Sequence, residues 1–79
     1  MRQAILEELG FQITSIKYNW IFETDVITAT KSTGRGDIEI MWGHQCARVT
    51  KPNGTIKWYY EKTDKQVRRA LIQAIEFYA

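Results

Sequence analysis

Apolar side chains recur along this chain with two different spacings, and each spacing predicts a different element. Across residues 16–22 apolar and polar positions alternate, which is typical of a half-buried β-strand, so we expect a strand over residues 11–22. Phe11 and Ile13 are out of phase with the later positions, which indicates a bulge near Thr14.

Four further strands are expected after this first one. They are rich in β-branched or alternating apolar residues, and clusters of turn residues separate them. We place them at residues 26–31, 38–42, 45–50 and 55–61.

The strongest hairpin signal is Lys-Pro-Asn-Gly at residues 51–54, where proline suits the first corner of a type I turn and glycine a positive φ. We predict a four-residue loop, which pairs Val49 with Ile56 and turns Trp58 toward the core. A three-residue bulged loop would instead pair Val49 with Lys57. Because side chains alternate along a strand, a slip of one residue exchanges the two faces.

A helical spacing governs both ends of the chain. Residues 2–9 predict a short helix that ends at Gly10, where a left-handed cap is needed. Thr63 is a good N-cap for the last helix, and Gln66 completes a capping box. The apolar side of this helix consists of Val67, Ala70, Leu71, Ala74, Ile75 and Tyr78.

These elements predict an α+β fold in a single domain over residues 1–79. Connections of hairpin length make the sheet antiparallel, a single twisted layer of four to five strands in the order α-β-β-β-β-β-α. We expect the short N-terminal helix beside it and the long amphipathic C-terminal helix packed on one of its faces. The strand order and the turn type at Pro52 stay open.

The composition restricts where the protein is expected to work. The chain has one cysteine, Cys46, so it cannot form an internal disulfide, and no segment resembles a signal peptide. No apolar run approaches the roughly 18 residues of a transmembrane helix. We therefore expect a cytoplasmic protein that has no membrane partner.

The alternation along the strands predicts two sheet faces of different character. We expect Trp20, Trp42 and Trp58 beneath the last helix. The opposite face should then carry a basic surface interleaved with apolar groups, made of Lys17, Ile21, Met41, Arg48, Thr50, Lys57 and Tyr59. Such a mixture suits protein interfaces, and also nucleic acid, where cations meet phosphate and aromatic rings stack on bases.

Positive charge is concentrated in the second half of the chain. The net charge is +2 overall, but residues 48–69 hold seven basic and two acidic side chains, a net charge of +5. Lys65, Arg68 and Arg69 lie on the first two turns of the last helix. This cluster loosely resembles double-stranded-RNA-binding domains, which present basic residues at the start of their final helix. The chain departs from that family before Thr63, where it lacks a glycine-containing loop, so we assign no family.

No constellation in the sequence specifies a reaction. His44 and Cys46 are the only soft metal ligands, and zinc sites need three or four protein ligands. A Cys46 nucleophile with His44 as its base would need a shaped pocket and a third orienting group, and the sequence shows neither. We therefore expect no catalytic residues, no metal and no cofactor, and an enzyme is the least favoured class.

Binding is the class of function that remains. We expect a small interaction or inhibitor module, comparable to accessory and phage-type proteins, that engages a protein or nucleoprotein complex. The alternative is a nucleic-acid-binding module that contacts phosphates through residues 48–69, and a homodimer through the sheet face or a sheet edge is also open. The expected partner-binding residues are Lys17, Met41, Arg48, Lys57, Tyr59, Lys65, Arg68 and Arg69.

Overall fold

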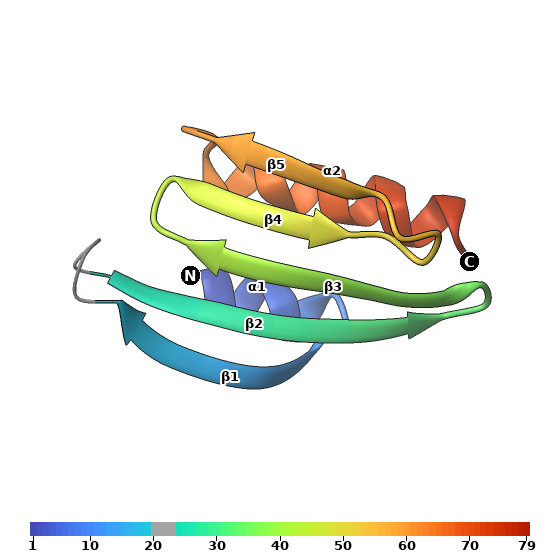
Figure 1. The fold of residues 1–79 in the computed structure, drawn as a ribbon, viewed down its shortest axis with the longest axis horizontal. Coiled ribbons are helices and arrows are strands. Elements are labelled where there is room, and N and C mark those ends of the chain that lie inside the picture. The colour runs from blue at the N-terminus through green and yellow to red at the C-terminus, as the bar shows by residue number, and fades with distance from the viewer. Residues whose placement is uncertain (20–23) are drawn as a thin grey trace.

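The computed structural model describes residues 1–19 and 24–79 and consists of five strands between two helices. The elements are, in chain order, α1 (Arg2–Glu8), β1 (Gln12–Asn19), β2 (Thr24–Thr33), β3 (Gly36–Gly43), β4 (Cys46–Thr50), β5 (Ile56–Tyr60) and α2 (Asp64–Phe77) (Figure 1). The predicted fold class and element order are confirmed. β2 is longer than predicted, because Thr33 pairs with Gly36 across a two-residue turn.

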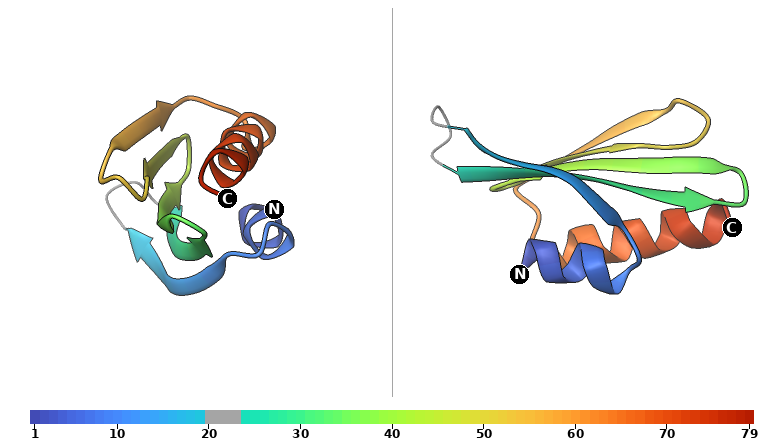
Figure 2. Two further views of the ribbon diagram at one scale, coloured as in Figure 1. Left: turned by 90° about the vertical axis from the view of Figure 1, so that its right-hand side faces the viewer. Right: turned by 90° about the horizontal axis from the view of Figure 1, so that it is seen from below.

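The strands form one antiparallel sheet in which neighbours in sequence are neighbours in space, in the order β1-β2-β3-β4-β5. Both helices lie on the same side of this sheet (Figure 2). We call this side the helix face and the opposite side the open face. The core lies between helices and sheet and contains Leu6, Phe11, Ile27, Ala29, Ile38, Ile40, Trp42, Ala47, Val49, Val67, Leu71 and Ala74.

The predicted bulge in β1 is confirmed. The register of β1 against β2 shifts between Ile13 and Ser15, so that Ile13 pairs with Ala29 and Ile16 with Ile27. The extra residue brings both isoleucines onto the helix face although their spacing is odd. The expectations for Trp20 and Ile21 lie outside the described residues.

The end of α1 follows the predicted left-handed cap. Gly10 has φ +86°, a conformation that costs glycine far less than other residues. The Phe11 amide donates to the Leu6 carbonyl oxygen at 2.9 Å, and the Phe11 side chain is buried in the core. At the other end of α1, the Arg2 guanidinium donates to the Asp25 and Trp42 carbonyl oxygens, which ties this short helix to the sheet.

The loop between β4 and β5 is the three-residue alternative, so the predicted four-residue loop is wrong. The Gly54 amide donates to the Lys51 carbonyl oxygen at 2.9 Å, and Gly54 has φ +87°. Lys51 then pairs with Thr55 through a 2.8 Å hydrogen bond from its amide. A type I turn followed by a left-handed residue is the usual geometry of a three-residue hairpin loop, and Pro52 occupies its first corner.

This loop moves every β5 side chain to the face opposite the predicted one. Val49 pairs with Lys57, and Arg48 pairs with Trp58. Trp58 therefore lies on the open face and is 49% exposed, whereas Trp42 is buried as predicted at 2%. The prediction that Trp58 lies in the core is wrong, because the register differs by one residue.

The start and the apolar side of α2 agree with the sequence pattern. The Thr63 hydroxyl accepts from the Gln66 amide at 3.1 Å, and the Gln66 side chain accepts from the Thr63 amide at 2.9 Å. The buried residues on this side are Val67, Leu71, Ala74 and the adjoining Tyr78. Within the described residues, neither helix has both the length and the apolar character needed to cross a bilayer.

Leu71 provides a test of the packing between α2 and the sheet. Its side chain is fully buried, and Leu71→Ala should lower the free energy of unfolding by about 2–5 kcal/mol, because truncation leaves a cavity. Gln73→Ala, at an exposed position of the same helix, should change it by less than about 0.5 kcal/mol. Urea denaturation followed by circular dichroism measures both values, and equal losses would contradict this packing.

Candidate functional site

The open face carries a shallow hollow of about 400 Å³ that spans all five strands. No helix among the described residues covers this face (Figure 2). Apolar and aromatic side chains form most of its wall, and one arginine crosses it. The lining residues are Asn19, Thr24, Val26, Met41, Gly43, His44, Cys46, Arg48, Trp58 and Tyr60.

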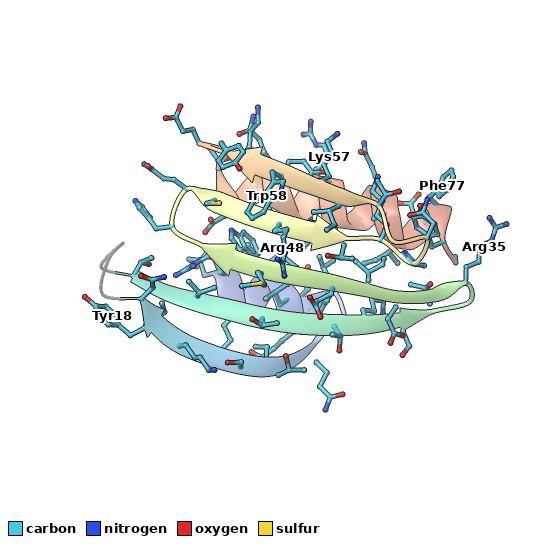
Figure 3. The ribbon with its side chains drawn as sticks, in the orientation of Figure 1. Tyr18, Arg35, Arg48, Lys57, Trp58 and Phe77 are labelled. Atoms are coloured by element: carbon cyan, nitrogen blue, oxygen red, sulfur yellow. The ribbon has the colours of Figure 1, made fainter. Side chains whose placement is uncertain are left out.

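Arg48 is held by contacts on three sides. Its Nη2 donates to the Met41 Sδ at 2.7 Å and lies 3.6 Å from the Glu39 Oε1. Its guanidinium lies 5.8 Å from the centre of the Trp58 ring, within the range of a cation–π contact. Figure 3 shows Arg48 and Trp58 projecting from adjacent strands on the same side of the sheet.

One donor of Arg48 has no acceptor among the described residues. Its Nε is buried and forms no hydrogen bond with any of the described residues. Leaving a buried donor unpaired costs on the order of 1–3 kcal/mol, so the other contacts of this side chain must compensate for it. Glu39 partly offsets the charge of the guanidinium.

Trp58 and Tyr60 form an aromatic strip along β5. Their rings are stacked, with centres 5.9 Å apart and an angle of 9° between their planes. They remain 49% and 60% exposed, and Ile56 on the same side of the strand is 52% exposed. Three large apolar side chains therefore meet solvent in a row, which marks a binding surface more often than a single exposed side chain does.

The predicted site residues of the sheet are divided between its two faces. Lys17, Met41 and Arg48 lie on the open face as expected, and Lys17 and Met41 line a second shallow depression beside the hollow. Their part in binding stays a prediction.

Lys57 and Tyr59 lie on the helix face, so their predicted place on the open face is wrong. The physical reason is the register of β5, which pairs them with Val49 and Ala47. They line a gap of about 300 Å³ between β5 and α2, next to Phe77. Lys57 is exposed, and its Nζ lies 5.4 Å from the centre of the Tyr59 ring.

The basic cluster on α2 is smaller than its sequence indicates. Arg68 forms a 2.8 Å salt bridge with Glu8 and thereby connects the two helices. Lys65 and Arg69 are exposed on the outside of α2. They lie on the opposite side of the sheet from Arg48 (Figure 2), so the +5 segment does not form one continuous surface.

Charge on the open face is balanced. The described strands place two basic side chains on this face, Lys17 and Arg48, and two acidic ones, Asp37 and Glu39. The two acids alternate with the core residues of β3. Cations that track a phosphate backbone are expected to outnumber nearby acids. The open face is therefore an aromatic surface that contains both signs of charge.

His44 and Cys46 both line the hollow. No group of three His, Cys, Asp or Glu side chains with metal-binding geometry occurs in residues 1–19 and 24–79. His44 lies in the turn between β3 and β4, and Cys46 is the first residue of β4.

No family model, curated protein or solved structure matches this chain. The five strands also differ from the α-β-β-β-α order of double-stranded-RNA-binding domains. A functional assignment therefore depends on the geometry of the open face.

Sequence reasoning missed the residues that dominate the site, Ile56, Trp58 and Tyr60. The three-residue loop, the alternative for the turn at residues 51–54, would have placed these side chains on the open face. Two registers of β5 fitted that turn, and one of them placed these side chains on the open face.

The two orientations of tryptophan predict different fluorescence. Trp58→Phe should remove emission that a soluble quencher such as acrylamide reaches easily, because this indole is half exposed. Trp42→Phe should remove emission that is blue-shifted and resists quenching. Trp20 contributes equally to both variants, so their difference reports Trp42 and Trp58 alone. Quenching constants at high dilution measure the effect, and a lower quenching constant in Trp42→Phe than in Trp58→Phe would contradict the assignment.

Proposed function

We propose that this chain is a non-enzymatic, cytoplasmic binding protein that engages a protein partner through the open face of its sheet. An interaction or inhibitor module of the accessory or phage type has this character. The observation that carries the proposal is the exposed strip of Ile56, Trp58 and Tyr60 beside Arg48 and Met41.

The residue types on the open face support a protein partner. Tryptophan, tyrosine, methionine and arginine are enriched in protein interfaces, and tryptophan, tyrosine and arginine account for much of the energy at binding hot spots. Trp58 and Arg48 support each other through their contact at 5.8 Å. Their side chains are thus partly ordered before binding, which lowers the entropy lost when a partner docks.

The alternative function, nucleic-acid binding through residues 48–69, has less support. Its basic residues are distributed over both sides of the sheet, and Arg68 is already paired with Glu8. The stacked Trp58 and Tyr60 rings suit base stacking, but the acids Asp37 and Glu39 share their face. We therefore favour a protein partner and treat nucleic acid as an outcome of the test.

Recovery of the tagged chain from a lysate of its source, with and without nuclease, tests the proposal. We expect a co-purifying protein to remain after nuclease treatment. Met41→Ala and Trp58→Ala should each weaken its affinity about tenfold or more, the loss typical of a central interface residue. The matched double variant Lys65→Ala and Arg69→Ala should bind normally. Calorimetry with the purified partner measures these affinities.

A nucleic-acid function would give the opposite pattern. The chain would then bind labelled single- or double-stranded oligonucleotides with an affinity that falls steeply as salt rises. The Lys65 and Arg69 double variant would lose binding, whereas Met41→Ala would keep it. Met41 lies in β3, away from the sheet edge, so its variant tests the open face without substituting a residue of β5.

A further inference from the structure

The two edge strands of the sheet, β1 and β5, are protected to different degrees against pairing with another chain. β1 contains a bulge, which interrupts the regular row of backbone groups along its outer side. β5 has neither a bulge nor a proline and pairs in regular register with β4 over its full length. Natural edge strands usually carry such interruptions or charged side chains, which prevent pairing with another chain. The one charged residue of β5 is Lys57, and its ammonium contacts the Tyr59 ring. The free side of β5 is therefore open to one more strand.

The hydrogen bonds at both ends of β5 define which backbone groups face outward. The Lys51 amide donates to the Thr55 carbonyl oxygen, and the Glu61 amide donates to the Gln45 carbonyl oxygen, both at 2.8 Å. Hydrogen-bonded pairs alternate along an antiparallel ladder. The backbone groups of Lys57 and Tyr59 therefore point toward β4, and those of residues 56, 58 and 60 point away from the sheet.

We propose that β5 pairs with β5 of a second copy of this chain, antiparallel and centred on Trp58, so that two five-stranded sheets join into one. This register pairs all three outward-facing residues of each strand. Trp58 meets Trp58 of the second copy, and Ile56 meets Tyr60 of the second copy. Each of these residues then donates and accepts one backbone hydrogen bond across the two-fold axis.

The side chains agree with this register. On the open face, apolar Ile56 lies opposite aromatic Tyr60, and such cross-strand pairs stabilise a sheet. On the helix face, Lys57 lies opposite Tyr59 of the second copy, so that no like charges meet. The Lys57 ammonium already contacts the Tyr59 ring of its own chain at 5.4 Å.

Neighbouring registers are less favourable. Centring on Lys57 would place the two Lys57 side chains opposite each other, and like charges in that position are destabilising. Centring on Tyr59 would place Ile56 opposite residue 62 of the second copy, beyond the end of β5 at Tyr60. Among these registers, only the one centred on Trp58 pairs the whole of β5 with itself.

Sedimentation equilibrium measures the assembly directly. We expect a mass of twice 9.3 kDa at high concentration, which falls toward the single mass on dilution because β5 has only five residues. This inference does not depend on the proposed function, since it concerns the purified chain alone. A monomer at every concentration would overturn the proposed dimer, and the free side of β5 would then be available to a strand of another protein.

Two matched double variants test the register. Ile56→Glu with Tyr60→Lys places opposite charges across the axis twice and should retain the dimer, more strongly at low salt. Ile56→Lys with Tyr60→Lys places like charges there and should give a monomer. Both variants alter the same half-exposed positions, so circular dichroism should show both folded. A dimer of equal strength in both would overturn the register.

Hydrogen exchange locates the interface independently of any substitution. The amides of Ile56, Trp58 and Tyr60 should become protected as concentration rises, whereas those of Lys57 and Tyr59 should be protected at all concentrations by β4. A concentrated dimer in which the Ile56, Trp58 and Tyr60 amides still exchange rapidly would assign the contact to another surface and overturn the proposal.

Discussion

The three-residue turn between β4 and β5 is the constraint on which the open face depends. Gly54 adopts a positive φ and donates to the Lys51 carbonyl oxygen, so that Lys51 pairs with Thr55. Because side chains alternate along a strand, this one pairing assigns every residue of β5 to a face. Trp58 and Tyr60 thereby stack beside Arg48, and Lys57 and Tyr59 turn toward α2.

The core tolerates this arrangement because β5 lies at the edge of the sheet. Lys57 reaches solvent past α2 and keeps its charge over the Tyr59 ring, so no lysine is buried. The packed interior is instead supplied by β2, β3 and β4 with both helices, and Arg2 and the Arg68–Glu8 pair connect the helices to the sheet and to each other. One face of the sheet packs against the helices, and the other exposes Ile56, Trp58 and Tyr60 to solvent.

The two proposals concern adjoining parts of one surface. A dimer centred on Trp58 would place two open faces side by side in a single sheet, because a two-fold axis perpendicular to the sheet keeps equivalent faces together. The hollows around the two Arg48 side chains would then flank the central aromatic strip. A partner could meet both copies, which raises its effective affinity when the two sites are engaged together.

Local sequence patterns account for the elements and for most of their boundaries. Three signals are local: the capping at Thr63, the left-handed Gly10 and the phase change near Thr14. The conformational preferences of a few neighbouring residues are enough to predict each of them. The burial of Trp42 and the apolar side of α2 also followed from periodicity, since one face of each element is strongly apolar.

The faces of β5 and the pairing of charges were settled by how the folded chain brings its segments together. Both loop lengths agreed with the residues at 51–54, and residues 56–60 are apolar or aromatic at four of their five positions, so periodicity could not choose between the two faces. The pairing of Arg68, which distinguishes it from the exposed Lys65 and Arg69, depends on Glu8, sixty residues away in the sequence. Both decisions depend on contacts between segments distant in sequence, which local preferences do not encode.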